Sequence, residues 1–194
     1  VSYHAASAGI SASGRILQLL ESTRTSSNAT LNVVPGFTLI SGPSGSGKSR
    51  AILATLDRNP DAFAWMPQRV TLMAGTVLSN VVGPGPYESK SLDLAIAMAH
   101  LDDVSLEYVI DDSGQGLSGG QMQRVMLARA FYRALEFPQA ALLLDEPTSS
   151  IDSVRRQGIR YHLQNLAQAG RAVIVASHEP AFRELADTII EVGR

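Results

Sequence analysis

Short apolar runs bounded by glycine or by polar residues recur along the chain after residue 31. Runs of this length are typical of strands, and the lack of an apolar–polar alternation indicates strands that are covered on both faces of a sheet. The segments predicted to form strands are 37–41, 62–66, 140–144, 172–176 and 189–192. None of the runs approaches the roughly 18 consecutive apolar residues that indicate a membrane-spanning helix.

Between these runs, apolar residues recur at the spacing of helices. The segment 92–104 is predicted to place Leu94, Met98 and Leu101 on one helical face, and Pro60 and Pro138 end two other helices. The predicted helices cover residues 49–56, 92–104, 121–135 and 153–169. Strands that alternate with helices predict an α/β domain in which a mostly parallel sheet is flanked by helices.

The composition agrees with one folded domain over residues 1–194. The chain is 45% hydrophobic, lacks cysteine and carries a formal net charge of −2, which excludes a disulfide-stapled miniprotein and argues against a disordered chain. Residues 1–30 are rich in Ser, Ala, Thr and Gly and predict a loop-rich segment before a core at 31–194. The chain has no excess of basic residues of the kind that indicates binding to nucleic acid. The chain begins at Val1, as expected for a piece cut from a longer polypeptide.

A glycine-rich sequence lies between the first predicted strand and the first predicted helix. Residues 42–49 read GPSGSGKS and match the phosphate-loop pattern G-x-x-x-x-G-K-[ST] without a mismatch. Small residues let backbone N–H groups turn toward phosphate oxygens at a helix N-terminus. We expect Lys48 to contact the β- and γ-phosphates and Ser49 to offer its hydroxyl to Mg²⁺. The predicted nucleotide-binding residues of this segment are Gly42, Pro43, Ser44, Gly45, Ser46, Gly47, Lys48, Ser49 and Arg50.

Two adjacent carboxylates follow the apolar run 140–144. A buried strand that ends in acidic residues is unfavourable unless a cation or another positive group meets them. Asp145 is therefore predicted to bind the Mg²⁺ beside Ser49, directly or through one of its ligands. Glu146 is then placed to accept a proton from an attacking water molecule.

The sequence LSGGQ at 117–121 opens the helix predicted over 121–135. Ser118, Gly119 and Gly120 would offer N–H groups at a helix N-terminus, which makes a second anion site. Residues 114–119 also match the dinucleotide pattern G-x-G-x-x-G, which requires an acidic residue at the end of the next strand about 20 residues on. Glu136 lies at that distance but at the end of a predicted helix, which disfavours the dinucleotide interpretation.

Together these motifs resemble the ATP-binding cassette family, the nucleotide-binding domains of ABC transporters. In that family the phosphate loop, the LSGGQ signature and the acidic strand end (Walker B) occur in this order, and the resemblance runs from about residue 31 to the end. It implies a P-loop NTPase fold and an ATPase that uses ATP and Mg²⁺. It also implies two domains packed head to tail. The residues expected to contact ATP held by the other domain are Ser118, Gly119, Gly120 and Gln121.

The resemblance assigns roles to residues that indicate little by themselves. Gln68 resembles the Q-loop glutamine, which contacts Mg²⁺ and faces the transmembrane partner. Asp152 resembles the D-loop aspartate at the dimer interface, and its position also fits the N-cap of the helix predicted over 153–169. His178 resembles the switch histidine that contacts the γ-phosphate. Tyr3 is a candidate for the aromatic residue that stacks on adenine, with a place in a frayed N-terminal strand as the alternative.

The spacing departs from the family pattern. Gln68 follows Lys48 by only 20 residues, which predicts reduced antiparallel and helical subdomains. Residues 75–80 and 108–112 resemble segments of exporter-type cassettes, although a helix start or a turn explains them nearly as well.

The function implied by the resemblance is that of the ATP-hydrolysing motor domain of a membrane transporter, of exporter type, at the cytoplasmic face of the membrane. Its catalytic residues would be Glu146, His178 and Lys48, and its partners a second nucleotide-binding domain and fused or separate transmembrane domains. One alternative is a soluble ABC-type ATPase of DNA repair or chromosome maintenance, which usually carries long insertions that are missing here. Another is a nucleotide-gated regulatory module, which Glu146 and His178 disfavour. We expect no nucleic-acid partner.

Overall fold

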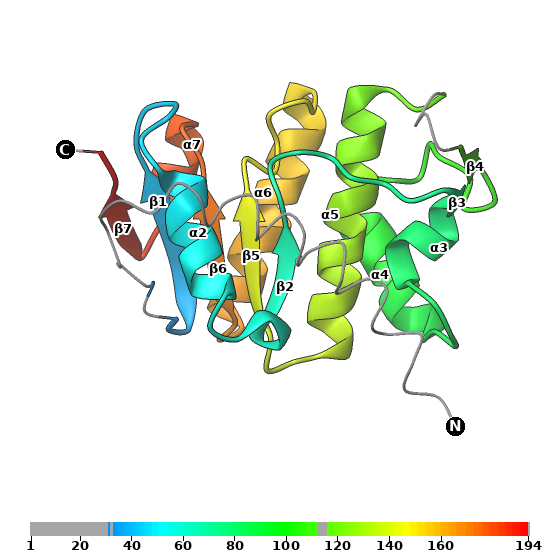
Figure 1. The fold of residues 1–194 in the computed structure, drawn as a ribbon, viewed down its shortest axis with the longest axis horizontal. Coiled ribbons are helices and arrows are strands. Elements are labelled where there is room, and N and C mark those ends of the chain that lie inside the picture. The colour runs from blue at the N-terminus through cyan, green and yellow to red at the C-terminus, as the bar shows by residue number, and fades with distance from the viewer. Residues whose placement is uncertain (1–30, 32, 112–115, 194) are drawn as a thin grey trace.

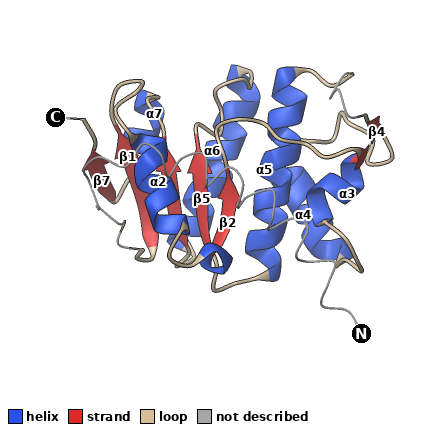
Figure 2. Ribbon diagram, viewed as in Figure 1, coloured by secondary structure: helices blue, strands red, loops and turns tan. Residues whose placement is uncertain are grey.

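A parallel sheet forms the centre of the domain (Figures 1 and 2). The structure is a computed structural model and describes residues 31, 33–111 and 116–193; Tyr3 and the segment 1–30 lie outside the described residues. The five strands of the sheet have the order β2-β5-β6-β1-β7, and every neighbouring pair is parallel. The strands are β1 Gly36–Ser41, β2 Phe63–Met66, β5 Ala141–Asp145, β6 Ala172–Ala176 and β7 Thr188–Glu191. The predicted fold class is confirmed.

Helices cover both faces of the sheet (Figure 2). One apolar cluster joins α2 to the face that carries Leu143, and the other joins α5 and α6 to the face that carries Leu142 and Leu144. This alternation follows from the period of two residues in a strand. The helices are α2 Lys48–Leu56, the 3₁₀ helix η2 Pro60–Ala62, α3 Val77–Val82, α4 Ser89–Met98, α5 Gly119–Glu136, α6 Ser153–Gln168 and α7 Pro180–Arg183.

The antiparallel part of the domain is small, as the short spacing predicts. It consists of β3 Gly75–Thr76 paired with β4 Val109–Ile110. The helices α3 and α4 pack beside α5, on the side of α5 away from the central sheet (Figure 1). Among the described residues, no helix has both the length and the apolar composition required to cross a bilayer.

The helix predicted over 92–104 is wrong in its end and in its buried face. The helix α4 ends at Met98, and His100 then adopts a left-handed conformation with φ 50°, which breaks the helical path. Within α4, the buried stripe consists of Leu92, Ala95 and Met98, whereas Leu94 is 53% exposed. Leu101 is buried, but it reaches the core from the segment after the helix. The predicted face therefore combined Met98, which is buried within α4, with Leu94, which is exposed, and with Leu101, which lies beyond the helix.

This difference can be tested by two truncations of the same kind. Leu143→Ala should lower the free energy of unfolding by about 2–5 kcal/mol, because it removes a fully buried side chain from the central strand β5. Leu94→Ala should change it by less than about 0.5 kcal/mol, because the side chain lies in solvent. Urea denaturation measures both values. Equal losses for the two variants would contradict the exposed position of Leu94.

Candidate functional site

The phosphate loop connects the end of β1 to the start of α2, and the Lys48 side chain at its end contacts the carbonyl groups at its beginning. Gly45 and Gly47 have φ values of +79° and +98°, in the left-handed region that side chains disfavour. At Gly42, an added Cβ would clash with the carbonyl oxygen of Val192. Lys48 Nζ donates to the carbonyl oxygens of Gly42 at 2.7 Å and Pro43 at 3.1 Å, so its ammonium group folds back over the loop. The chain therefore turns tightly between β1 and α2, over the residues predicted to bind phosphate.

The two acidic residues after the apolar run of β5 are both buried, with 2% exposure for Asp145 and 5% for Glu146. Burial raises the pKa of the Asp145 carboxyl above its ordinary value, and a hydrogen bond from Ser49 opposes that rise without cancelling it. Within the part of the chain that the structure describes, Asp145 Oδ1 is buried and has no hydrogen-bond partner.

This arrangement fits a Mg²⁺ ion that arrives with a nucleotide. A carboxylate oxygen without a partner, beside a serine hydroxyl, offers the hard oxygen ligands that Mg²⁺ prefers, and such ions are held by few protein ligands together with phosphates. No cluster of three or more His, Cys, Asp or Glu side chains suited to a metal occurs among the described residues. Ser49 and Asp145 are therefore suited to complete a metal–phosphate site rather than to form a metal site alone.

Glu146 lies where the catalytic candidates meet. Its Oε1 is 2.9 Å from His178 Nδ1 and 3.9 Å from Lys48 Nζ. Its backbone has φ +48°, an unfavourable conformation for a residue with a side chain, and its N–H donates to the carbonyl of Ala176 at 2.8 Å. The structure thus brings together Glu146, His178 and Lys48 from three separate segments.

Two residues of this centre were missed by the sequence analysis. The hydroxyl of Ser177, a buried residue, donates to Glu146 Oε2 at 3.2 Å and accepts the backbone N–H of Glu179 at 3.1 Å. Glu179 in turn accepts a hydrogen bond from Thr148 Oγ1 at 2.7 Å. The only signal in the sequence was their position, directly after the apolar strand β6 and on either side of His178.

The signature motif forms the N-terminus of α5. Ser118 is the N-cap, and its hydroxyl accepts from the backbone N–H of Gln121 at 3.2 Å. Gln121 Oε1 accepts the N–H of Ser118 at 2.9 Å, which completes a capping box. This second helix start, predicted from the sequence, is therefore held by the serine and glutamine of the motif itself.

The start of α5 also lies close to the D-loop, residues 149–152. An added Cβ at Gly120 would lie 2.7 Å from the carbonyl oxygen of Ser150. Gln123, which the sequence analysis missed, donates to the Glu146 carbonyl at 2.8 Å and accepts the Ser150 N–H at 2.7 Å. Asp152 caps α6 by accepting from the N–H groups of Val154 and Arg155, as its position predicts.

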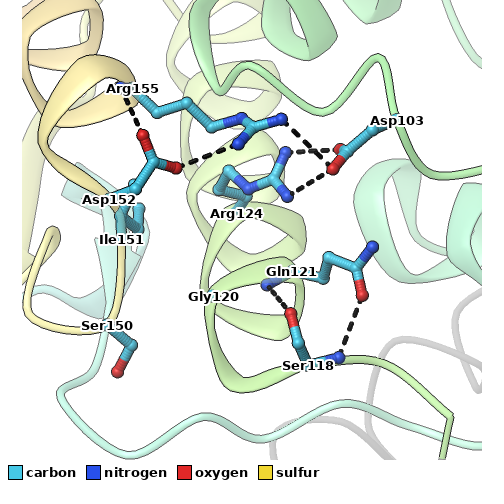
Figure 3. Close-up of a pocket in the computed structure, with 9 residues that line it drawn as sticks. All are labelled: Asp103, Ser118, Gly120, Gln121, Arg124, Ser150, Ile151, Asp152 and Arg155. Carbon is cyan, nitrogen blue, oxygen red and sulfur yellow. Dashed lines mark hydrogen bonds and ion pairs between the residues drawn. The ribbon is translucent and has the colours of Figure 1, made fainter.

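The signature residues and the D-loop share an open hollow of about 490 Å³ on the surface (Figure 3). No residue of the phosphate loop is part of its lining. The lining residues are Asp103, Ser118, Gly120, Gln121, Arg124, Ser150, Ile151, Asp152 and Arg155. The predicted site residues therefore form two groups in one chain: a phosphate-loop group with Glu146 and His178, and a signature group with Asp152.

Three predicted residues remain outside these groups. Gln68 is exposed and follows β2, whose parallel neighbour β5 ends at Asp145, so both leave the same edge of the sheet. Arg50 is exposed on the first turn of α2. Tyr3 lies outside the described residues.

Comparison with known proteins identifies the family. The profile of the family described as ABC transporter matches residues 27–149. The chain belongs to the ABC transporter family. It is 34% identical over 202 residues to the ATP-dependent lipid A-core flippase of Cupriavidus metallidurans, which covers 86% of this chain and 33% of the flippase. It is 37% identical over 167 residues to the zinc import ATP-binding protein ZnuC of Pseudomonas putida, which covers 77% of this chain and 61% of that protein.

Solved structures agree with this assignment. The dimeric structure of a bacterial ABC transporter cassette has a TM-score of 0.69 and 26% sequence identity, and the match covers 84% of this chain and 83% of that one. The predicted family and the class of ABC ATPases are thereby confirmed. The chain spans about a third of the flippase, so it corresponds to one part of that larger relative.

The contact between Gly120 and the D-loop gives a test of the signature geometry in this ABC cassette. Gly120→Ala should lower the free energy of unfolding by about 1–3 kcal/mol, because the new methyl group meets the Ser150 carbonyl. Gly119→Ala is the matched control and should change it by less than about 0.5 kcal/mol, because nothing lies within 4 Å of the added Cβ. Urea denaturation separates the two, and the same loss for both would contradict the close approach.

Proposed function

We propose that this ABC cassette binds Mg²⁺-ATP and hydrolyses it as the motor domain of a membrane transporter. The observation that carries the proposal is the position of Glu146. This buried carboxylate, directly after the end of β5, contacts His178 and lies near Lys48. A general base must lie within reach of a water that attacks the γ-phosphate, and phosphoryl transfer otherwise depends on positioning and on positive charge.

Each residue of this group has a distinct task in the proposed reaction. The backbone N–H groups of the phosphate loop and the ammonium group of Lys48 bind the β- and γ-phosphates. Ser49, Asp145 and Gln68 hold Mg²⁺, which neutralises phosphate charge when bound. Glu146 orients the attacking water and accepts its proton, while His178 contacts the γ-phosphate from the end of β6. Ser177 holds the second oxygen of Glu146 in place.

The complete ATP site is proposed to form between two cassettes arranged head to tail. The signature residues Ser118, Gly119, Gly120 and Gln121 line or adjoin a hollow that contains no phosphate-loop residue. In the proposed dimer, this hollow covers the γ-phosphate bound by the other cassette, and Asp152 lies at the interface. The dimeric form of the related bacterial cassette supports this arrangement.

The second partner is proposed to be a set of transmembrane domains, fused or separate, which places the cassette at the cytoplasmic face of the membrane. Similarity to the flippase and the segments 75–80 and 108–112 support the exporter type. The zinc import relative shows that comparable similarity extends to an import protein, so the substrate and the direction of transport depend on the membrane partner.

A soluble ABC-type ATPase acting on DNA has less support. The formal net charge of −2 gives no overall attraction to DNA, and 20 residues from Lys48 to Gln68 leave no room for a long insertion there. A regulatory module with little catalysis would not require the contact between Glu146 and His178. Salt-sensitive binding of duplex DNA would favour the first alternative, and ATP binding without turnover in the presence of membrane partners would favour the second.

Glu146→Gln tests the assignment of the base and the dimer together. The variant should retain ATP binding and lose about 10²–10⁴-fold in the hydrolysis rate, because glutamine cannot accept the proton of water. Since bound ATP is no longer consumed, the particle mass should rise with Mg²⁺-ATP from 20.7 kDa toward twice that value. Light scattering measures the mass, and phosphate release measures the rate.

Lys48→Ala is the control for that experiment, because it should lose ATP affinity and therefore show neither dimer nor turnover. Hydrolysis by Glu146→Gln at the rate of the unchanged protein would refute the role of Glu146 as the base. ATP binding without any rise in mass would refute the dimer of this chain with itself and leave the assignment of the base intact.

The raised pKa of Asp145 predicts a pH dependence for Mg²⁺-ATP binding. The carboxylate binds Mg²⁺ only when deprotonated, and burial makes it take up a proton at a higher pH than an ordinary aspartate. The Mg²⁺-dependent gain in ATP affinity should therefore decline, as the pH falls, before a free aspartate would titrate. Calorimetry with and without Mg²⁺ measures this gain.

Asp145→Asn is the control for the pH series, since it removes the titrating group and leaves the protonation of the nucleotide itself. Its residual pH dependence is subtracted from that of the unchanged protein. A gain that followed the same pH curve in both proteins would contradict Asp145 as the metal ligand.

A further inference from the structure

We propose that Asp103 and Arg155 are positioning residues that hold the signature helix and the D-loop in a fixed relation, so that both reach a second cassette as one surface. The proposal rests on the head-to-tail dimer proposed above. It concerns two residues that bind neither nucleotide nor metal, and it follows from the charged groups that line the hollow (Figure 3).

The first half of the connection joins Asp103 to the signature helix. Arg124, one turn after the LSGGQ motif on α5, donates from Nη1 to Asp103 Oδ1 at 2.6 Å and from Nη2 to Asp103 Oδ2 at 2.9 Å. Arg124 also donates to the carbonyl of His100. The Arg124 side chain is only 5% exposed, and its hydrogen bond lowers the pKa of the Asp103 carboxyl. A bidentate arginine–carboxylate pair whose arginine is buried has little freedom to reorient.

The second half joins the same carboxylate to the D-loop. Arg155 lies on the first turn of α6 and spans two carboxylates: Nη2 is 3.3 Å from Asp103 Oδ2, and Nη1 is 2.9 Å from Asp152 Oδ2. The other oxygen of Asp152 accepts the N–H groups of Val154 and Arg155. These bonds lower the pKa of Asp152 to about 2, so the carboxylate is charged at any physiological pH.

The result is a row of alternating charges from α5 through the segment after α4 to α6. Asp103 is the central member, since it contacts arginines from both helices (Figure 3). On the other side of the same hollow, Gln123 and the close approach of Gly120 already join α5 to Ser150. The D-loop is therefore held at two points: at Ser150 by Gln123 and at Asp152 by Arg155.

Stability alone does not account for the Arg155 contacts. Asp103 and Arg155 side chains are each 36% exposed, and exposed ion pairs contribute little to the free energy of folding. A contact that contributes little to folding can still restrict a loop to the conformation that a partner requires. Ordering such a loop before association removes an entropy cost that would otherwise weaken the dimer.

The geometry also distinguishes arginine from lysine at residue 155. The two Nη atoms of one guanidinium contact two different carboxylates, and a single ammonium group lacks this fork. Arg155→Lys should therefore keep the charge and lose the bridge. If Arg155→Lys weakens the dimer nearly as much as Arg155→Gln does, the cause is the lost geometry of the guanidinium group and not a lost charge.

The test measures ATP-driven dimerisation of the 194-residue chain in the Glu146→Gln background. Arg155→Gln should raise the dissociation constant of the Mg²⁺-ATP dimer roughly fivefold to tenfold, the cost of ordering one or two side chains at an interface. ATP affinity at protein concentrations far below that constant should stay unchanged, because the phosphate loop is not touched. Light scattering over a dilution series gives the first value and nucleotide titration gives the second.

Asp93→Asn is the matched control, because it removes a carboxylate from the exposed face of α4, near Asp103 in the chain. It should leave both constants unchanged. Asp103→Asn, alone and with Arg155→Gln, completes a double-mutant cycle. If the two residues act through their mutual contact, the double variant should dimerise no more weakly than the weaker single variant.

The outcomes separate this proposal from the one on which it rests. A dimer of Glu146→Gln that Arg155→Gln weakens, with non-additive effects in the cycle, supports the positioning role. An unchanged dimer in Arg155→Gln, or additive losses in the cycle, would overturn it and leave the proposed ATPase intact. ATP binding without a dimer in Glu146→Gln itself would overturn the head-to-tail arrangement of this chain, and the positioning role with it.

Discussion

Burial of charge at the carboxyl edge of the sheet is the constraint on which the rest of the site depends. Asp145 and Glu146 follow the apolar residues of β5 into the interior, where a carboxylate is unfavourable unless donors or cations meet it. The Glu146 carboxylate accepts a hydrogen bond from Ser177, contacts His178 and lies within ion-pair distance of Lys48. For Asp145 the compensation is incomplete, since one oxygen has no partner within the described chain and its pKa is raised. This carboxylate oxygen of Asp145 lies beside Ser49, where the Mg²⁺ of a bound nucleotide would supply the missing positive partner.

The helix α5 transmits this arrangement to the surface. Its N-terminus is the signature motif, and one turn further Gln123 contacts both the backbone of Glu146 and the D-loop. The next residue, Arg124, contacts Asp103. A helix that packs on a sheet usually buries an apolar stripe. Gln123 and Arg124 are buried polar residues of α5, and both find hydrogen-bond partners there. The helix that carries the signature motif is therefore connected directly to the backbone of Glu146.

In the proposed dimer, the separation of the two groups of site residues makes hydrolysis depend on a second cassette. The phosphate-loop group can bind a nucleotide, while the signature group opens onto a different hollow. Under the proposed arrangement, each chain supplies half of two sites, so hydrolysis depends on the approach of a second cassette. The energy of nucleotide binding can then drive a movement of two bodies, as a transport motor requires.

Local rules of the chain explain how much of this was visible in the sequence. Apolar runs predicted the five parallel strands to within a few residues, because a strand covered on both faces requires them. The glycines of the phosphate loop, the helix start at the signature motif and the cap Asp152 were equally visible, since left-handed backbone and helix caps act over a few residues. The family resemblance added the order of the motifs.

Other features were decided only by the tertiary structure. The contact of Ser177 with Glu146 joins residues 31 apart in the sequence, and that of Arg155 with Asp103 joins residues 52 apart. Leu94 fits a helical face in the sequence, but the end of α4 and the packing of α5 turn it into solvent. A serine, an arginine or a leucine has the same local preferences whether it contacts a distant segment or faces solvent. Its partner is determined by which distant segment the folded chain places against it.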